Sequence, residues 1–141
     1  MKSIIAKATL LLLFSTTLFS FSAKPGGEGF EILLNNKVLL QKFGNEMNTI
    51  QSLQLSQMAP EDQLTIKYYH CGKLGKNRVI TVRDAQNIIV KEFHYPDAAT
   101  VSMALPINNL LALKKASHVV LKLYYSSSEL AAGRELATIS I

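Results

Sequence analysis

The chain of 141 residues contains one cysteine, Cys71, and no tryptophan. Disulfides commonly stabilise exported proteins, and the N-terminus predicts export, but a single cysteine excludes an internal disulfide. The stability of the fold must then come from an apolar core. Three states remain open for Cys71: a buried small side chain, a free thiol, or one half of a disulfide that links two chains as a dimer.

Motifs of common active sites are also lacking. Residues 72–76 combine glycines and lysines, but they lack the lysine-serine/threonine ending of a phosphate-binding loop. The run 126–128 is three serines without the glycines of a nucleophile elbow, and serine runs are typical of turns. Alternating strand and helix patterns, which build parallel nucleotide-binding sheets, are absent from the sequence. We therefore expect no enzyme activity, no catalytic residue and no cofactor.

Residues 1–22 have the three parts of a secretory signal peptide. Lys2 and Lys7 make the positive region, Ala8–Phe14 is an apolar run, and serines occupy the two positions that small residues favour before a cut after Ser22. The apolar stretch is shorter than the roughly 20 residues that span a bilayer. We expect an exported protein, periplasmic or extracellular, whose mature chain has no transmembrane anchor.

The mature chain would comprise residues 23–141, which is 119 residues, enough for one domain. Residues 23–29 include two adjacent glycines and predict a flexible N-terminus, followed by a single domain over 30–141. Without Lys2 and Lys7 the net charge is +3, from 13 basic and 10 acidic side chains. A charge of this size does not indicate a nucleic-acid partner.

Most of the mature chain alternates between apolar and polar residues, as strands do. Residues 30–34 and 37–43 flank Asn35-Asn36, a pair that tolerates the positive φ of a two-residue hairpin turn. A regular register would place Leu39 and Phe43 on the face of Phe30, and Leu40 on the other. Further strands are predicted near residues 50–55, 64–69, 79–82, 88–93, 100–105, 119–125 and 136–141. Their buried positions should include Ile66, Ile80, Val82, Leu121 and Leu123.

Residues 106–115 have a helical rhythm instead, with a proline at the start and two lysines at the end. This segment predicts one short helix or 3₁₀ turn. Eight or nine strands at regular spacing, with this single interruption, predict an all-β fold: an antiparallel β-sandwich of immunoglobulin-like type.

Two loops of the predicted sandwich have similar sequences. Residues 68–78 read YYHCGKLGKNR, and residues 124–134 read YYSSSELAAGR. Serines in the second loop occupy the positions of His70 and Cys71, so the loop shape does not require histidine and cysteine. We expect Leu74 and Leu130 to fold back onto the core. The loops are candidate interaction sites through Lys73, Lys76, Arg78, Ser126, Ser127 and Ser128.

A metal site is the alternative reading of the first loop. His70, Cys71, His94, His118 and Met103 supply the ligand types of a mononuclear copper centre. Neighbouring side chains on an extended strand point to opposite faces, however, and the spacing forms no metal-binding motif. We therefore expect surface or edge histidines, a half-buried cysteine and no metal site. The alternative is a copper- or zinc-binding protein that uses His70, Cys71 and another histidine.

The leader, the hairpin at residues 30–36 and the two Tyr-Tyr loops together resemble small exported bacterial β-sandwich proteins of unknown function. Residues 105–110, LPINNL, are similar to the turn before the penultimate strand of immunoglobulin-like domains. Without a tryptophan or a cysteine pair, only that architecture is implied and antibody-type domains are excluded. A fold resemblance implies no activity. We expect a non-catalytic exported module that binds a protein, a glycan or the cell envelope.

Overall fold

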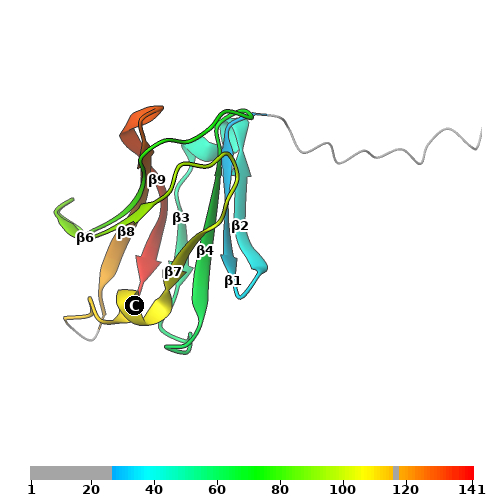
Figure 1. The fold of residues 1–141 in the computed structure, drawn as a ribbon. Helices are drawn as coiled ribbons and strands as arrows, with labels where there is room; N and C mark the ends of the chain where they lie inside the picture. The colour runs from blue at the N-terminus through cyan, green and yellow to red at the C-terminus, as the bar shows by residue number, and fades with distance from the viewer. Residues whose placement is uncertain (1–26, 116–117) are drawn as a thin grey trace, which may run out of the picture.

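The computed structural model describes residues 27–115 and 118–141, which form two β-sheets packed face to face (Figure 1). One sheet has four strands in the order β2-β1-β4-β7, and the other has five in the order β3-β9-β8-β5-β6. The predicted signal peptide lies outside the described residues. The strands are β1 (Gly29–Leu34), β2 (Lys37–Phe43), β3 (Gln51–Gln54), β4 (Gln63–Tyr69), β5 (Arg78–Arg83), β6 (Ile89–Tyr95), β7 (Met103–Pro106), β8 (Val120–Ser127) and β9 (Leu130–Ser140).

The predicted all-β sandwich is confirmed. Every strand pair is antiparallel except β3 with β9, which run parallel. The predicted short helix is present as α2 (Ile107–Leu111), directly after Pro106. A second short element, the 3₁₀ helix η1 (Gly44–Asn48), was not predicted; it carries the chain from β2 in one sheet to β3 in the other. No helix in residues 27–115 and 118–141 has the length and apolar character needed to cross a membrane.

The first hairpin has the predicted turn but not the predicted register. Asn35 and Asn36 both have positive φ, 47° and 69°. A β-bulge follows, because Ile32 pairs with residue 40 while residue 33 pairs with residue 38. One extra residue moves every later side chain to the other face. Leu40 therefore joins the core, and Phe43 packs outside it against the ring of Tyr69, so the regular register was wrong.

The core lies between the two sheets and contains the predicted side chains Ile66, Ile80, Val82, Leu121 and Leu123, all buried. Tyr68 of β4 and Tyr125 of β8 stack across it with ring centroids 4.1 Å apart. Both rings are at one end of the sandwich, where the loop 70–77 and the turn 128–129 also lie; we call it the His70 end. Figure 1 shows α2 at the opposite end, which we call the α2 end. The turn 84–88 lies near this end, since Asp84 lines a pocket together with Leu113 and Lys115.

Candidate functional site

The two loops of similar sequence lie side by side at the His70 end and brace each other. The backbone N–H of Ser128 donates to the carbonyl of Lys76 at 2.8 Å, and the N–H of Lys76 donates to the Glu129 carboxylate at 3.0 Å. The side-chain amide of Asn77 also donates to the Ser128 hydroxyl at 2.8 Å. Much of the polar chemistry of these loops is therefore used to hold them together.

His70 is buried beside the stacked tyrosines, with 9% of its surface exposed; its ring centroid lies 4.8 Å from that of Tyr68 and 5.5 Å from that of Tyr125. Its Nε2 lies 2.8 Å from the Tyr125 hydroxyl and 3.5 Å from the Ser127 hydroxyl. Burial lowers the pKa of His70 below its ordinary 6.5, since the charged ring would lose its hydration. The expected surface position of His70 was wrong. Tyr68 points into the core, and strand alternation carries the residue two positions on to the same face.

Cys71 points away from its neighbour. A tight turn closes there, with the N–H of Lys73 donating to the carbonyl of His70 at 3.0 Å, and Cys71 adopts a φ of 54°. Its thiol is free and the residue is exposed, so the expected half-burial was wrong. The turn borders a shallow hollow of about 270 Å³, which is lined by Glu28, His70, Cys71, Lys73, Glu129 and Leu130.

The six candidate interaction residues divide by burial. Arg78 is 2% exposed, and its guanidinium donates to the carbonyls of Pro96 and Val101 at 2.7 Å each. Ser127 is also buried, so neither residue offers a surface to a partner. Ser126 is half-buried, while the exposed members are Lys73, Lys76 and Ser128.

The leucines of the two loops also differ. Leu130 is partly buried and packs against the core, as expected. Leu74 is 46% exposed, so the expectation that it folds back onto the core was wrong. Similar loop sequences therefore do not give equivalent contacts.

The other candidate metal ligands lie elsewhere. His94 is exposed on β6, with its Nε2 3.5 Å from a Glu92 carboxylate oxygen. His118 is exposed at the α2 end, just before β8, and Met103 is fully buried in the core. In the part of the chain that the structure describes, no three histidine, cysteine, aspartate or glutamate side chains are grouped so that they could hold a metal ion.

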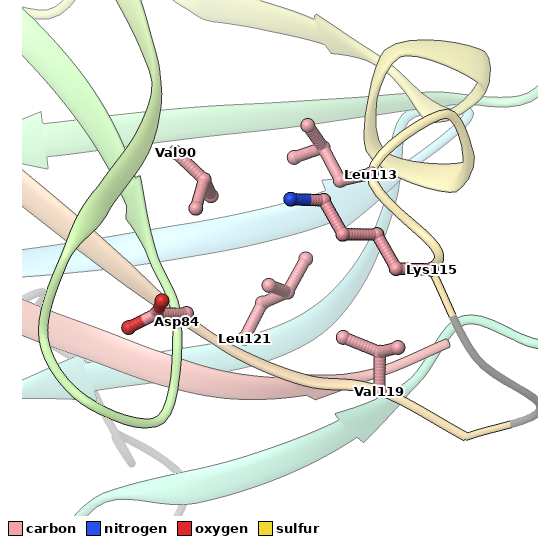
Figure 2. A pocket seen from close by; sticks show the side chains of 6 residues that line it. All are labelled: Asp84, Val90, Leu113, Lys115, Val119 and Leu121. Carbon is pink, nitrogen blue, oxygen red and sulfur yellow. The ribbon is translucent and has the colours of Figure 1, made fainter.

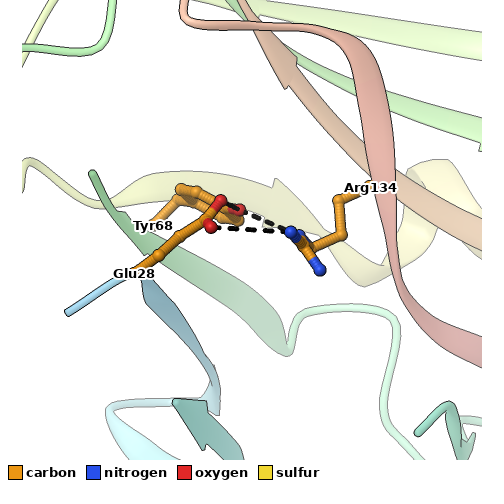
Figure 3. Close-up of polar contacts among 3 residues, drawn as sticks. All are labelled: Glu28, Tyr68 and Arg134. Carbon is orange, nitrogen blue, oxygen red and sulfur yellow. Dashed lines mark hydrogen bonds and ion pairs between the residues drawn. The ribbon is translucent and has the colours of Figure 1, made fainter. Parts of the chain in front are cut away.

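A polar network that the sequence analysis missed joins the two sheets at the His70 end (Figure 3). The Tyr68 hydroxyl donates to the Glu28 carboxylate, and Arg134 Nε donates to that hydroxyl at 3.2 Å. Arg134 also lies 3.5 Å from a Glu28 oxygen. Burial and the neighbouring Glu28 carboxylate raise the pKa of Tyr68 well above its ordinary 10.0. The fold therefore includes Glu28 and Gly29, which the sequence analysis placed in the N-terminal tail.

A largely apolar pocket of about 340 Å³ opens at the α2 end (Figure 2). Its lining comes from three places in the fold: the hairpin of β5 and β6, the loop after α2, and the start of β8. Figure 2 shows Lys115 extending across the pocket from the loop, with its ammonium directed towards Val90. The lining residues are Asp84, Val90, Leu113, Lys115, Val119 and Leu121.

Three of the exposed large apolar residues are sequence neighbours of this lining. Ile88 is 62% exposed, Ile89 50% and Val120 38%. A pocket of a few hundred Å³ with mostly apolar walls and a few charged groups is the usual form of a small binding site, and exposed apolar patches commonly mark contact surfaces. No sequence motif predicted this pocket, because its walls meet only through the order of the strands.

Comparison with known proteins gives no family for the chain. No protein-family model matches it, and no curated protein is significantly similar to it.

Proposed function

We propose that the chain is a non-catalytic exported binding module that holds an apolar group of a protein, glycan or cell-envelope partner in the pocket at the α2 end. The observation that carries this proposal is the pocket itself, with four aliphatic residues around it and the Lys115 ammonium directed into it. Such a site accepts an aliphatic group. The Lys115 ammonium offers a partner for a negative charge on that group, while the Asp84 carboxylate in the same lining accepts backbone N–H groups of its own turn. The leader-like N-terminus supports a location in the periplasm or outside the cell.

The His70 end supports a structural role better than a binding role. Its polar side chains contact one another: buried His70 contacts Tyr125, and the partly exposed Arg134 contacts Tyr68 and Glu28. Buried polar groups that are paired in this way stabilise a unique packing and leave few groups for a ligand.

The copper or zinc alternative has weaker support. His70 Nε2 is in contact with the Tyr125 hydroxyl, and Cys71 faces solvent on the other side of a tight turn. A ligand pair would require the turn to rearrange. The exposed Cys71 thiol instead suits a disulfide between two chains under oxidising conditions.

Methyl NMR tests the pocket directly. The purified exported protein, labelled at leucine and valine methyl groups, is titrated with octanoate, an aliphatic carboxylate. Saturable shifts are expected at Val90, Leu113, Val119 and Leu121. Val38, which is exposed on β2 in the other sheet, serves as the internal reference and should not shift.

A pocket-filling variant provides the second arm. Val90→Phe adds volume inside the pocket and should weaken the octanoate response, whereas Val101→Phe, at a residue exposed near the His70 end, should leave it unchanged. Shifts that spread over the whole surface without saturating, or that survive Val90→Phe, would contradict the proposal.

A further inference from the structure

We propose that the α2 end docks on an anionic lipid surface through the tip of the β5–β6 hairpin. This inference rests on the proposed binding role of the α2 end and names the chemistry of the partner. The surface, called here the hairpin-tip patch, consists of Arg83, Ile88, Ile89, Lys115, Val120 and Lys122.

Strand pairing places most of the patch on one face of the five-stranded sheet. Ile89 pairs with Arg83, and Arg83 pairs with Lys122, which makes one row across three strands. Val120 lies two residues before Lys122 on β8 and therefore faces the same side. Leu121, between them, is buried in the core, so this row is on the outer face of the sheet.

The turn holds Ile88 at the tip of the hairpin. Asp84 Oδ1 accepts the backbone N–H groups of Gln86 and Ile88, each at 2.9 Å, and the Asp84 N–H donates to the Ile88 carbonyl at 2.9 Å. Lys122 Nζ donates to Asn87 Oδ1 at 2.9 Å, which ties the turn to β8. Turn positions usually carry polar residues, so an isoleucine that is 62% exposed in a fixed turn marks a contact surface.

The cations of the patch form no ion pair within the described residues. Neither Arg83 nor Lys115 lies within ion-pair distance of a carboxylate in residues 27–115 and 118–141. Arg83 lies over the ring of Tyr124 at 4.1 Å, and Lys122 bonds to the neutral amide of Asn87. Asp84 directs its carboxylate oxygen to backbone N–H groups of its own turn. The patch itself contains three cations and no carboxylate around its exposed aliphatic side chains. The nearest acidic side chains on the same face, Glu92 and Glu135, lie in the next row of the sheet.

This composition favours a lipid surface over a protein partner. Protein interfaces are enriched in aromatic residues and methionine and depleted of lysine. The exposed apolar members here are isoleucine and valine, and two of the three cations are lysine. Peripheral membrane binding has two main contributions. Aliphatic side chains enter the boundary between headgroups and acyl chains, and cations are attracted to anionic headgroups.

The test uses the absence of tryptophan from the sequence. In an Ile88→Trp variant of the purified exported protein, the introduced indole is the only tryptophan fluorophore, since the parent chain contains no tryptophan. Mixing it with vesicles of phosphatidylcholine and phosphatidylglycerol in equal parts should shift its emission to the blue and allow quenching by brominated lipid. Val101→Trp is the matched control, because Val101 is also 62% exposed and lies near the His70 end. That variant should show no shift.

Vesicle sedimentation then separates the contributions of charge and apolar contact. Lys122→Gln should lower the partition coefficient by about fivefold, the effect of one cation near an anionic surface. The double variant Ile88→Ser with Ile89→Ser should lower it further, while Lys73→Gln and Val101→Ser should not change it. Added salt should weaken binding of the parent.

Three results would overturn the lipid proposal. They are equal partition into pure phosphatidylcholine vesicles, equal losses in the control variants, and no partition together with patch-dependent binding to an acidic polypeptide. A saturable octanoate site without vesicle binding would preserve the proposed function and refute this inference. Vesicle binding with an unresponsive pocket would support this inference and refute the pocket.

Discussion

The burial of His70 predicts that acid destabilises this protein through one identifiable side chain. In the unfolded chain a histidine titrates with a pKa near 6.5, whereas in the folded protein burial lowers the pKa of His70. Of the nearby charges, Arg78 also lowers this pKa, and Glu129 and Glu28 partly oppose the shift. Below pH 6.5 the unfolded chain therefore binds more protons at this position than the folded protein does.

The sign and the size of the effect follow from proton linkage. Stability should fall as the pH drops below the unfolded pKa, and the fall should stop below the folded pKa. One proton changes the free energy of unfolding by at most about 1.4 kcal/mol for each pH unit inside that window. Above about pH 8 the histidine is neutral in both states, so its contribution to the slope should vanish.

Urea denaturation from about pH 7 to about pH 5 measures this slope, which linkage relates to proton uptake. His70→Gln should flatten the profile relative to the parent, because the variant cannot take up that proton. His118→Gln is the matched control at an exposed residue and should keep the slope of the parent, because no ion pair within the described residues involves His118. Profiles that run parallel for the parent and His70→Gln would refute the reasoning, as would a parent that gains stability on acidification.

Three further predictions follow from burial and sequence. Leu123→Ala should lower the free energy of unfolding by roughly 2–5 kcal/mol in urea melts, whereas Val38→Ala, at an exposed residue, should change it by no more than about 0.5 kcal/mol; equal effects would contradict the assigned core. Cys71→Ser should change stability by no more than about 0.5 kcal/mol, since the residue is exposed, and should abolish any disulfide-linked dimer on non-reducing gels. Under reducing conditions, stoichiometric submicromolar copper or zinc binding that is lost in both His70→Ala and Cys71→Ser would instead establish the metal alternative. N-terminal sequencing of exported material should begin at Ala23, and a retained Met1 in a membrane fraction would contradict the signal peptide.

The sandwich could be predicted because its signals are local. Alternating residues such as Ile66, Ile80 and Leu123 identify strands and their buried face, and Asn35-Asn36 identifies a tight turn. These local signals did not predict the register of the first hairpin. Its bulge is one extra residue, and the cost of that residue depends on how Leu40 and Phe43 pack after the shift.

The position of His70 could have been predicted from the same local rule. Tyr68 belongs to the inward set of β4, and alternation continues for two more residues before the turn at Cys71. The loop comparison obscured this, because serine at the equivalent positions suggested that the pair was equally dispensable and equally exposed. Ser127, one of those serines, is itself buried and lies 3.5 Å from His70 Nε2.

Neither the pocket nor the hairpin-tip patch could be predicted in this way, because both depend on which strands are neighbours. Leu113 and Val90 are far apart along the chain, and they meet because β5 and β6 extend the sheet that also contains β8. The same order brings Ile89, Arg83 and Lys122 into one row. Each of these residues reads alone as an ordinary strand or loop residue. The binding surface we propose therefore depends on the order of the strands. The only hint of it in the sequence is the pair of isoleucines, Ile88 and Ile89, which are exposed and do not belong to the core.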